Sequence, residues 1–318
     1  MTLPGYNHKF GQQIMTDIEG VDIDRAFLAH FHIDAADAVA ADAGGILPLT
    51  KLGADAKSIE DGFTQPAVPR NVTIVASVAN VAGTVKIHGT NFAGEVIDET
   101  IALNATATSA KAGNKAFKTI TKVDLPARTN APAKQKATIA VTQGAQGAGT
   151  TIFTFTSAAT GAAYDISVEF AAEDSTTAKA ATVLAAALNA DAKFKAKWVA
   201  AVATANITIE SLTYAAQDTT INLVVKTAGE PNVTLGTITN NTTSGVAEDK
   251  VSIGLGKKFG LPYCLYADEL AILKLFNKAT ETPTEGAITA DATNLENNVY
   301  EPNGSPDGQK DIDLYIIV

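Results

Sequence analysis

The sequence predicts a mainly β protein, in which an antiparallel β-sandwich domain is interrupted by an inserted α+β (ββααββ) module and preceded by an N-terminal arm. Short segments rich in Val, Ile and Thr recur between Gly, Asn and Pro residues, which is typical of such a sandwich. These segments stand on both sides of a block with a different composition, as expected when a domain is inserted into a loop. We expect the arm at residues 1–65, the discontinuous sandwich at 66–130 and 248–318, and the inserted domain at 131–247.

The arm combines short apolar pieces with Gly and Asp. We expect residues 26–43 to be helical, because they are rich in Ala, and we expect Gly44, Gly45 and Pro48 to end that helix. Pro66 and Pro69 then predict a rigid, extended entry into the first β block.

The first β block shows alternation with a period of two. The predicted strands are residues 70–78, 83–92, 94–103 and 116–126. In the third of these segments, Ile97, Glu99 and Ile101 share one face, which predicts a half-buried strand.

The inserted block is predicted to contain two strands, two helical segments and two strands. A helix from Ser175 to about Asn189 is expected because Ser175 or Asp174 can cap it and because Val183, Leu184 and Leu188 form an apolar stripe. Residues 191–202 are expected to form a second, shorter helical piece, and Trp198 is expected in the core of the module.

The second β block resembles the first in composition and in its short predicted strands. Strands are expected at residues 250–256, 261–267, 269–277, 287–301 and 311–318.

Composition argues against several partners. The net charge of −10 repels nucleic acids and anionic membranes, and no segment has the roughly 20 apolar residues of a membrane-spanning helix. The amino terminus lacks the pattern of a signal peptide, so we expect synthesis in a cytoplasm. The single cysteine, Cys264, excludes an internal disulfide, and its large apolar neighbours predict a buried, inert thiol.

The segment VSIGLGKKFG, residues 251–260, raises the question of a phosphate-binding loop. Gly254, Gly256 and Gly260 fit neither the Walker spacing nor the dinucleotide fingerprint, and Pro262 follows where a helix would have to begin. We therefore expect these glycines to shape a crossing between strands, and no cofactor is expected.

One short motif could bind a metal ion. His30, His32 and Asp34 would share a face of a strand and could grip a metal, although a polar face of the arm is the reading favoured by the lack of a second histidine cluster. The acidic pairs Asp22/Asp24 and Asp311/Asp313 could bind calcium, but charges at a sheet edge explain them better.

Several segments resemble one protein family. The most specific are Gly-Thr-Asn-x-x-Gly-Glu-x-Ile-x-Glu-Thr at residues 89–100 and Gly-Asn-Lys-Ala-Phe-Lys-Thr at residues 113–119. With VSIGLGKKFGLPYCL, the C-terminal DATNLENNVYEPNGSPDGQKDIDLYIIV and HFHIDAADAVAADAGGI in the arm, they resemble virion structural proteins of tailed bacteriophages. The similarity spans a little over half of the chain and leaves out residues 131–247.

The resemblance implies a non-enzymatic virion component, and among virion roles we favour a head decoration or auxiliary capsid protein. The implied partners are the major capsid protein and other copies of the chain, for which a trimer would suit a capsid symmetry axis; no nucleic acid, membrane or small-molecule substrate is expected. The arm could add a strand to a neighbouring subunit. The expected contact residues in the arm are Phe27, His30, His32, Ile46, Leu47 and Leu49.

Two alternatives stay open. A tail-tube or baseplate protein would share the β-rich style with an inserted module. A bacterial adhesin or carbohydrate-binding module is disfavoured because aromatic residues make up only 6% of the chain, and sugar platforms usually stack on exposed rings.

Overall fold

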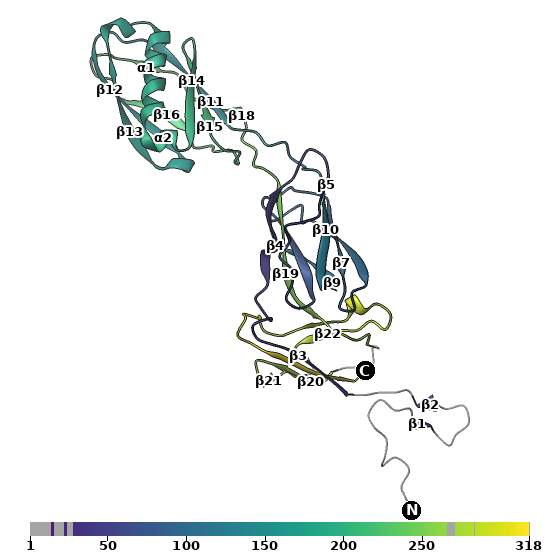
Figure 1. Ribbon diagram of the computed structural model, residues 1–318. Helices are drawn as coiled ribbons and strands as arrows, with labels where there is room; N and C mark the ends of the chain where they lie inside the picture. The colour runs from purple at the N-terminus through teal and green to yellow at the C-terminus, as the bar shows by residue number, and fades with distance from the viewer. Residues whose placement is uncertain (1–13, 16–21, 24–27, 266–270, 283, 318) are drawn as a thin grey trace, which may run out of the picture. The chain divides into compact units, whose positions relative to one another are not determined.

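The computed structural model describes residues 14–15, 22–23, 28–265, 271–282 and 284–317 (Figure 1). Strands make up 48% of the structure and helices 10%, and this content confirms the prediction of a mainly β protein. Every strand pairing in these described ranges is antiparallel. None of the helices in this part of the chain is both long and apolar enough to cross a bilayer.

The chain divides into two compact units. Unit 1 contains the residues up to Thr129 and from Asp249 onward, and unit 2 contains Asn130–Glu248. The backbone N–H of Thr129 donates a 2.8 Å hydrogen bond to the carboxylate of Asp249, so the two chain crossings are held together within unit 1.

Unit 1 contains three larger sheets. A four-stranded sheet has the order β5-β10-β7-β8, a six-stranded sheet has the order β22-β23-β19-β6-β9 with β4 also paired to β19, and a second four-stranded sheet has the order β21-β20-β24-β3. A separate short pair joins β1 (Ile14–Met15) to β2 (Asp22–Ile23). The strands of the three sheets are β3 (Leu28–Ile33), β4 (Asp42–Lys51), β5 (Lys57–Ile59), β6 (Arg70–Ala76), β7 (Thr84–Thr90), β8 (Val96–Ala102), β9 (Lys111–Phe117), β10 (Thr119–Leu125), β19 (Lys250–Gly260), β20 (Ala271–Phe276), β21 (Ala279–Thr280), β22 (Ala287–Thr289), β23 (Val299–Glu301) and β24 (Ile312–Ile317).

Two apolar clusters stabilise unit 1. The larger cluster joins β4 and β19 to the β5-β10-β7-β8 sheet and includes Ile46, Ile74, Ile87, Phe117 and Ile253. The second cluster packs side chains of β19 and β23 against those of β24. Burying these side chains contributes about 1.5–3 kcal/mol each.

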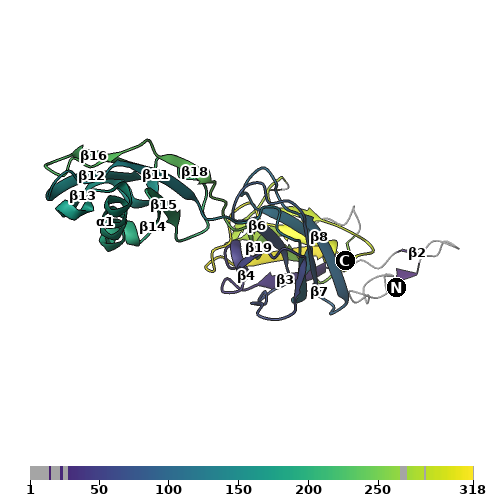
Figure 2. The same ribbon diagram turned by 90° about the horizontal axis from the view of Figure 1, so that it is seen from above.

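Unit 2 has its own core. One sheet has the order β14-β15-β11-β17, with β18 also paired to β11, and the other has the order β13-β12-β16. Figure 2 shows helix α1 (Thr177–Ala190) lying against these strands, where Ala181, Leu184 and Leu188 are buried. The remaining elements are β11 (Lys136–Gln143), β12 (Gly149–Ser157), β13 (Gly161–Phe170), α2 (Ala192–Lys195), β14 (Trp198–Ala203), β15 (Asn206–Ser211), β16 (Asn222–Thr227), β17 (Thr234–Leu235), β18 (Thr239–Thr243) and three short 3₁₀ turns, η1 (Ala158–Thr160) and η2 (Ala172–Asp174) in unit 2 and η3 (Leu295–Asn297) in unit 1.

Four secondary-structure predictions are wrong. Within the predicted helix at 26–43, residues 28–33 form β3, which pairs with β24, and residues 42–43 begin β4, which pairs with β19. The predicted strand at 287–301 is divided into β22 and β23, with the turn η3 between them. In the predicted helical piece at 191–202, only α2 is helical and the rest is β14, which pairs with β15 along its whole length. In the predicted strand at 261–267, the described residues 261–265 form no strand.

The main helix is close to its prediction. Its N-cap is Thr176, one residue beyond the expected Ser175, and the Thr176 hydroxyl accepts a hydrogen bond from the backbone N–H of Lys179. Trp198 is 3% exposed in the core of unit 2, which confirms its expected place.

Candidate functional site

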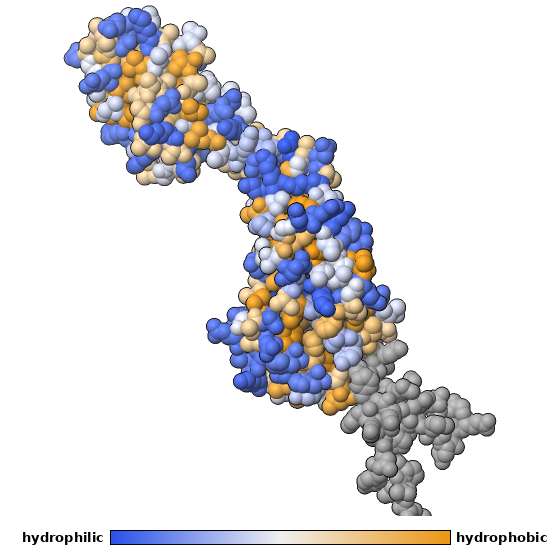
Figure 3. Space-filling view, in the orientation of Figure 1, coloured by the Kyte–Doolittle hydropathy of each residue, from blue (hydrophilic) through white to orange (hydrophobic). Residues whose placement is uncertain are grey.

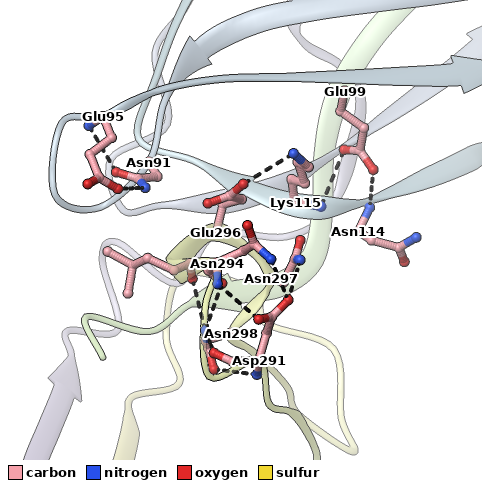
Figure 4. A network of polar contacts seen from close by, with 11 residues as sticks. Asn91, Glu95, Glu99, Asn114, Lys115, Asp291, Asn294, Glu296, Asn297 and Asn298 are labelled. Carbon is pink, nitrogen blue, oxygen red and sulfur yellow. Dashed lines mark hydrogen bonds and ion pairs between the residues drawn. The ribbon is translucent and has the colours of Figure 1, made fainter. Parts of the chain in front are cut away.

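Three of the segments that carry the family resemblance meet in unit 1. They are the β7–β8 turn, the facing parts of β8 and β9, and the loop around η3. Figure 4 shows two groups of polar contacts: Asn91 and Glu95 bond each other within the β7–β8 turn, and Lys115 of β9 contacts Glu296 of the η3 loop, 181 residues away in the sequence.

Asn91 closes the β7–β8 turn. Its side chain is fully buried; the carbonyl oxygen accepts hydrogen bonds from the backbone N–H groups of Ala93 and Glu95, and the amide donates to the Glu95 carboxylate at 2.8 Å. Gly94 has a φ of +85°, a conformation that favours glycine. The residues Asn, Gly and Glu of the pattern Asn-x-x-Gly-Glu therefore form the hydrogen bonds and the backbone conformation of this turn.

Glu99 ties β8 to β9. Its carboxylate accepts hydrogen bonds from the backbone N–H groups of Asn114 at 2.6 Å and Lys115 at 3.3 Å. Burial raises the pKa of Glu99, and these hydrogen bonds oppose that shift. A Cβ on Gly113 would overlap the same carboxylate, which explains the glycine in Gly-Asn-Lys.

Lys115 connects this pair of strands to the η3 loop. Its ammonium group lies 3.1 Å from the carboxylate of Glu296, whose side chain is only 10% exposed.

Asp291 and Asn298 organise the η3 loop. The Asp291 carboxylate accepts hydrogen bonds from the backbone of Thr293 and Asn294 and from the amides of Asn294 and Asn297, and these hold its pKa well below the usual range. Asn298 is fully buried, and its side chain accepts hydrogen bonds from two backbone N–H groups and donates to three carbonyls. The hydrogen bonds of both side chains therefore hold the loop itself together.

An open groove of about 400 Å³ lies beside Glu99. Among the residues that line it, there is no histidine or cysteine, and the charged ones are Glu99 and Lys111. Glu99 already accepts two backbone hydrogen bonds. The carboxylate beside the groove is therefore engaged in structural hydrogen bonds between β8 and β9.

The structure brings His30 and His32 together with a residue that the sequence did not connect to them. Both histidines lie on the exposed side of β3, and Asp313 is directly opposite His32 on β24. One carboxylate oxygen of Asp313 lies 2.8 Å from His30 Nε2 and 2.8 Å from His32 Nδ1. The pKa of Asp313 is lowered by these hydrogen bonds against the effect of burial, and the pKa of His32 is raised chiefly by its bond to Asp313.

The other predicted contact residues of the arm differ in exposure. Ile46 and Leu47 are 1% and 6% exposed and belong to the core of unit 1, so their assignment to a contact surface is wrong. Leu49 is 57% exposed and remains a surface candidate. Phe27 lies outside the described residues.

The glycine-rich segment lies inside strand β19. A Cβ on Gly254 would overlap the backbone of Asp42 in β4, and a Cβ on Gly256 would overlap the side chain of Asn71. The glycines therefore allow close strand contacts, and the described residues that follow them, 261–265 and 271–276, form no helix that could bind a phosphate. The prediction that Cys264 is buried is wrong: it is exposed, and partial desolvation together with nearby carboxylates raises the pKa of its thiol.

The sequence assigned Glu99 and Asn298 to no site, and it connected Asp313 with Asp311 rather than with the two histidines. Each becomes recognisable only through a partner on another strand or loop, although the quoted motifs contain Glu99 and the motif Asp-Ile-Asp contains Asp313.

Comparison with family models, curated proteins and solved structures finds no match to this chain.

Proposed function

We propose that this chain is a non-enzymatic structural protein of a tailed-bacteriophage virion, and that it decorates the head by binding and stabilising the major capsid lattice. The observation that carries the proposal is that two of the resembling segments, β8–β9 and the η3 loop, are connected in unit 1 by the bonds of Glu99 and by the Lys115–Glu296 ion pair. Such a network stabilises a surface of fixed shape, which is what lattice binding requires.

Unit 1 is the lattice-binding domain, an antiparallel sandwich whose core joins the β5-β10-β7-β8 sheet to β4, β6 and β19. Unit 2 is an α+β module inserted between Thr129 and Asp249, and the hydrogen bond between these two residues supports an insertion that leaves unit 1 intact.

The contact surface is proposed around exposed side chains of unit 1. Leu49 and Val96 are large apolar residues that are 57% and 86% exposed, and His30 and His32 lie on the exposed side of β3. On the face drawn in Figure 3, apolar patches are interrupted by hydrophilic ones, which suits a contact of mixed polarity (Figure 3). The partners are the major capsid protein and further copies of this chain, on the surface of the virion head.

The test is to mix the purified chain with undecorated phage heads and with isolated tails, and to image both by electron cryo-microscopy. Regular added density on the head lattice is expected. Binding to tails alone, or tubes and rings formed by the chain alone, would overturn head decoration in favour of a tail-tube or baseplate role.

Two matched variants locate the surface. Leu49→Ser and Val96→Ser should weaken binding to heads, whereas Val224→Ser, at an exposed position of unit 2, should bind like the original chain. Equal binding by all three variants would exclude the proposed surface. Binding of a glycan instead of heads or tails would favour a carbohydrate-binding module.

A further inference from the structure

The first and last long strands of unit 1 place two imidazoles and a carboxylate at one point. His30 and His32 are two residues apart on β3 and therefore project from the same face. Asp313 is the direct cross-strand partner of His32, and His30 is the partner of Tyr315, so Asp313 lies diagonally across from His30.

The potential ligand atoms are already close together. Asp313 Oδ1 is 2.8 Å from both His30 Nε2 and His32 Nδ1, and one such atom from each residue lies within 4.8 Å of the others. Ligand atoms about 2.0–2.2 Å from a tetrahedral zinc ion stand roughly 3.3–3.5 Å from one another. A metal ion could therefore enter after the Asp313 carboxylate moves away from the two imidazole nitrogens by about half an ångström.

Neighbouring groups hold both rings in the orientation that a metal would need. His32 Nε2 is 3.1 Å from a carboxylate oxygen of Asp34, which directs Nδ1 toward Asp313. The His30 ring stacks on Tyr315 with centroids 4.5 Å apart and planes 10° apart. A carboxylate on the far nitrogen of a ligating histidine is the usual second partner in metal sites.

We propose that His30 Nε2, His32 Nδ1 and Asp313 Oδ1 bind a divalent transition-metal ion, with Zn²⁺ as the preferred ion. Two imidazoles and one carboxylate match zinc better than calcium or magnesium, which prefer all-oxygen sites. The side chains of His30, His32 and Asp313 are 47%, 40% and 22% exposed, so a fourth coordination position faces solvent. Asp34 is a positioning residue that orients His32.

A second histidine in unit 1 provides a matched comparison. His88 Nε2 lies 2.9 Å from the carboxylate of Asp124, but Lys122 and Ser58 contact the same carboxylate. One imidazole beside a carboxylate that already has a cationic partner does not make a transition-metal site. His88 is therefore the control position for the proposed site.

The test uses the full chain without an affinity tag, freed of metal with a chelator. Zinc chloride is titrated by calorimetry, and cobalt chloride is titrated by visible absorption, because Co²⁺ reports coordination geometry. One ion per chain with micromolar or tighter affinity is expected, together with the intense visible bands of four-coordinate cobalt. Calcium chloride should give no comparable binding.

Four variants assign the ligands. His30→Gln, His32→Gln and Asp313→Asn should each weaken zinc binding by about 100-fold or more, and Asp34→Asn should weaken it by about 10-fold, as losses of ligands and of their orienting partners do. His88→Gln should bind zinc like the original chain. Circular dichroism and the thermal midpoint of each variant, measured without metal, establish that it is folded.

The proposal is overturned if the original chain gives neither binding heat nor a cobalt spectrum at micromolar metal. It is also overturned if folded His30→Gln and His32→Gln variants bind zinc as the original chain does. These measurements involve no phage particle, so their failure is separate from a failure of the proposed role on the virion head.

Discussion

Asn298 shows how a single side chain can stabilise a loop that has little regular structure. Its amide group is fully buried, accepts hydrogen bonds from the backbone N–H groups of Leu265 and Asp291, and donates to carbonyls of Asp291, Asn294 and Leu295. A buried polar group is favourable only while its partners are present, because each unsatisfied group costs about 1–3 kcal/mol.

We predict that Asn298→Ala lowers the free energy of unfolding by about 3 kcal/mol, since it leaves two buried N–H groups without acceptors. Urea unfolding followed by circular dichroism measures this loss. Asn114→Ala is the control, because the Asn114 side chain is exposed and accepts a hydrogen bond from the Lys258 ammonium group; it should change stability by about 0.5 kcal/mol or less. Similar losses in both variants would contradict the assigned role of Asn298.

Asp124 makes the stability of unit 1 depend on pH in the acid range. A hydrogen bond from Ser58, supported by His88 and Lys122, lowers the pKa of Asp124 to about 2. Because its pKa is about 3.9 in an unfolded chain, Asp124 contributes its full stabilisation above that pH and loses it as the pH falls through the folded-state value.

We predict that part of the stability of the protein is lost between about pH 4 and pH 2 and that Asp124→Asn removes this part. The side chain is 36% exposed, so solvent screening limits the effect to about 1 kcal/mol or less. Urea titrations across this pH range measure it, with Asp61→Asn as the exposed control. An unchanged acid dependence in Asp124→Asn would refute the prediction.

At the scale of the element, β19 is the strand around which unit 1 is organised. It pairs with β6 along one edge and with β4 and then β23 along the other. Gly254 lies in this region, directly opposite Thr73 of β6, and a Cβ there would overlap the backbone of Asp42 in β4. Glycine is therefore required by close backbone contact within a sheet.

We predict that Gly254→Ala destabilises the protein by about 3 kcal/mol or more, because the backbone of β4 must move to admit the methyl group. Gly44→Ala, at a position of β4 where the nearest atoms are 3.8 Å away, should change stability by less than about 1 kcal/mol. Thermal and urea unfolding compare the two. Equal stability of the variants would mean that the strands adjust freely.

The wrong helix prediction at β3 has a physical cause. In β3, buried Ala29 and Ile33 alternate with exposed His30 and His32, but this pattern is six residues long and is followed by a run of alanines. Alanine favours helices, so local propensity predicted the wrong state. Pairing with β24, nearly 300 residues away in the sequence, decided the outcome.

At the scale of the whole molecule, the two units have separate cores. The core of unit 2 contains only residues from its own segment, including Phe153, Leu184 and Trp198. The core clusters of unit 1 contain only residues from the two flanking segments. Separate cores predict that each unit can fold without the other.

We predict that unit 1 remains folded when residues 131–247 are replaced by a short Gly/Ser linker, because Thr129 and Asp249 are already hydrogen-bonded to each other. Unit 2, residues 130–248, should fold when expressed alone. Dispersed amide NMR spectra and cooperative thermal transitions are the expected results. An unfolded unit 1 would mean that it requires unit 2 for stability.

Two N-terminal deletions, one that removes β3, β4 and β5 and one that keeps them, should differ in stability. Removing residues 1–65 deletes β3, β4 and β5, together with buried Ile46, Leu47 and Leu52, so we predict loss of cooperative unfolding in unit 1. Removing only residues 1–27 keeps these strands, and cooperative unfolding should persist. Cooperative unfolding after the longer deletion would show that the three strands are dispensable.

The sequence by itself determined the features that depend on local patterns. Alternation in Ile97, Glu99 and Ile101 predicted the buried face of β8, and the apolar stripe with its capping residues placed α1 within about two residues. The spacing of the glycines in β19 was enough to argue against a phosphate loop. The change in composition near residues 130 and 248 also coincides with the boundaries of unit 2.

Only the tertiary structure decided which distant residues meet. It brought Asp313 between His30 and His32, joined Glu99 to Asn114, and placed Ile46 and Leu47 in the core instead of on a contact surface. The register between β3 and β24 sets the first contact, and the packing of one sheet against another sets the other two; both depend on whole sheets rather than on any short segment. For this reason the sequence identified the two histidines, and the fold supplied the carboxylate between them.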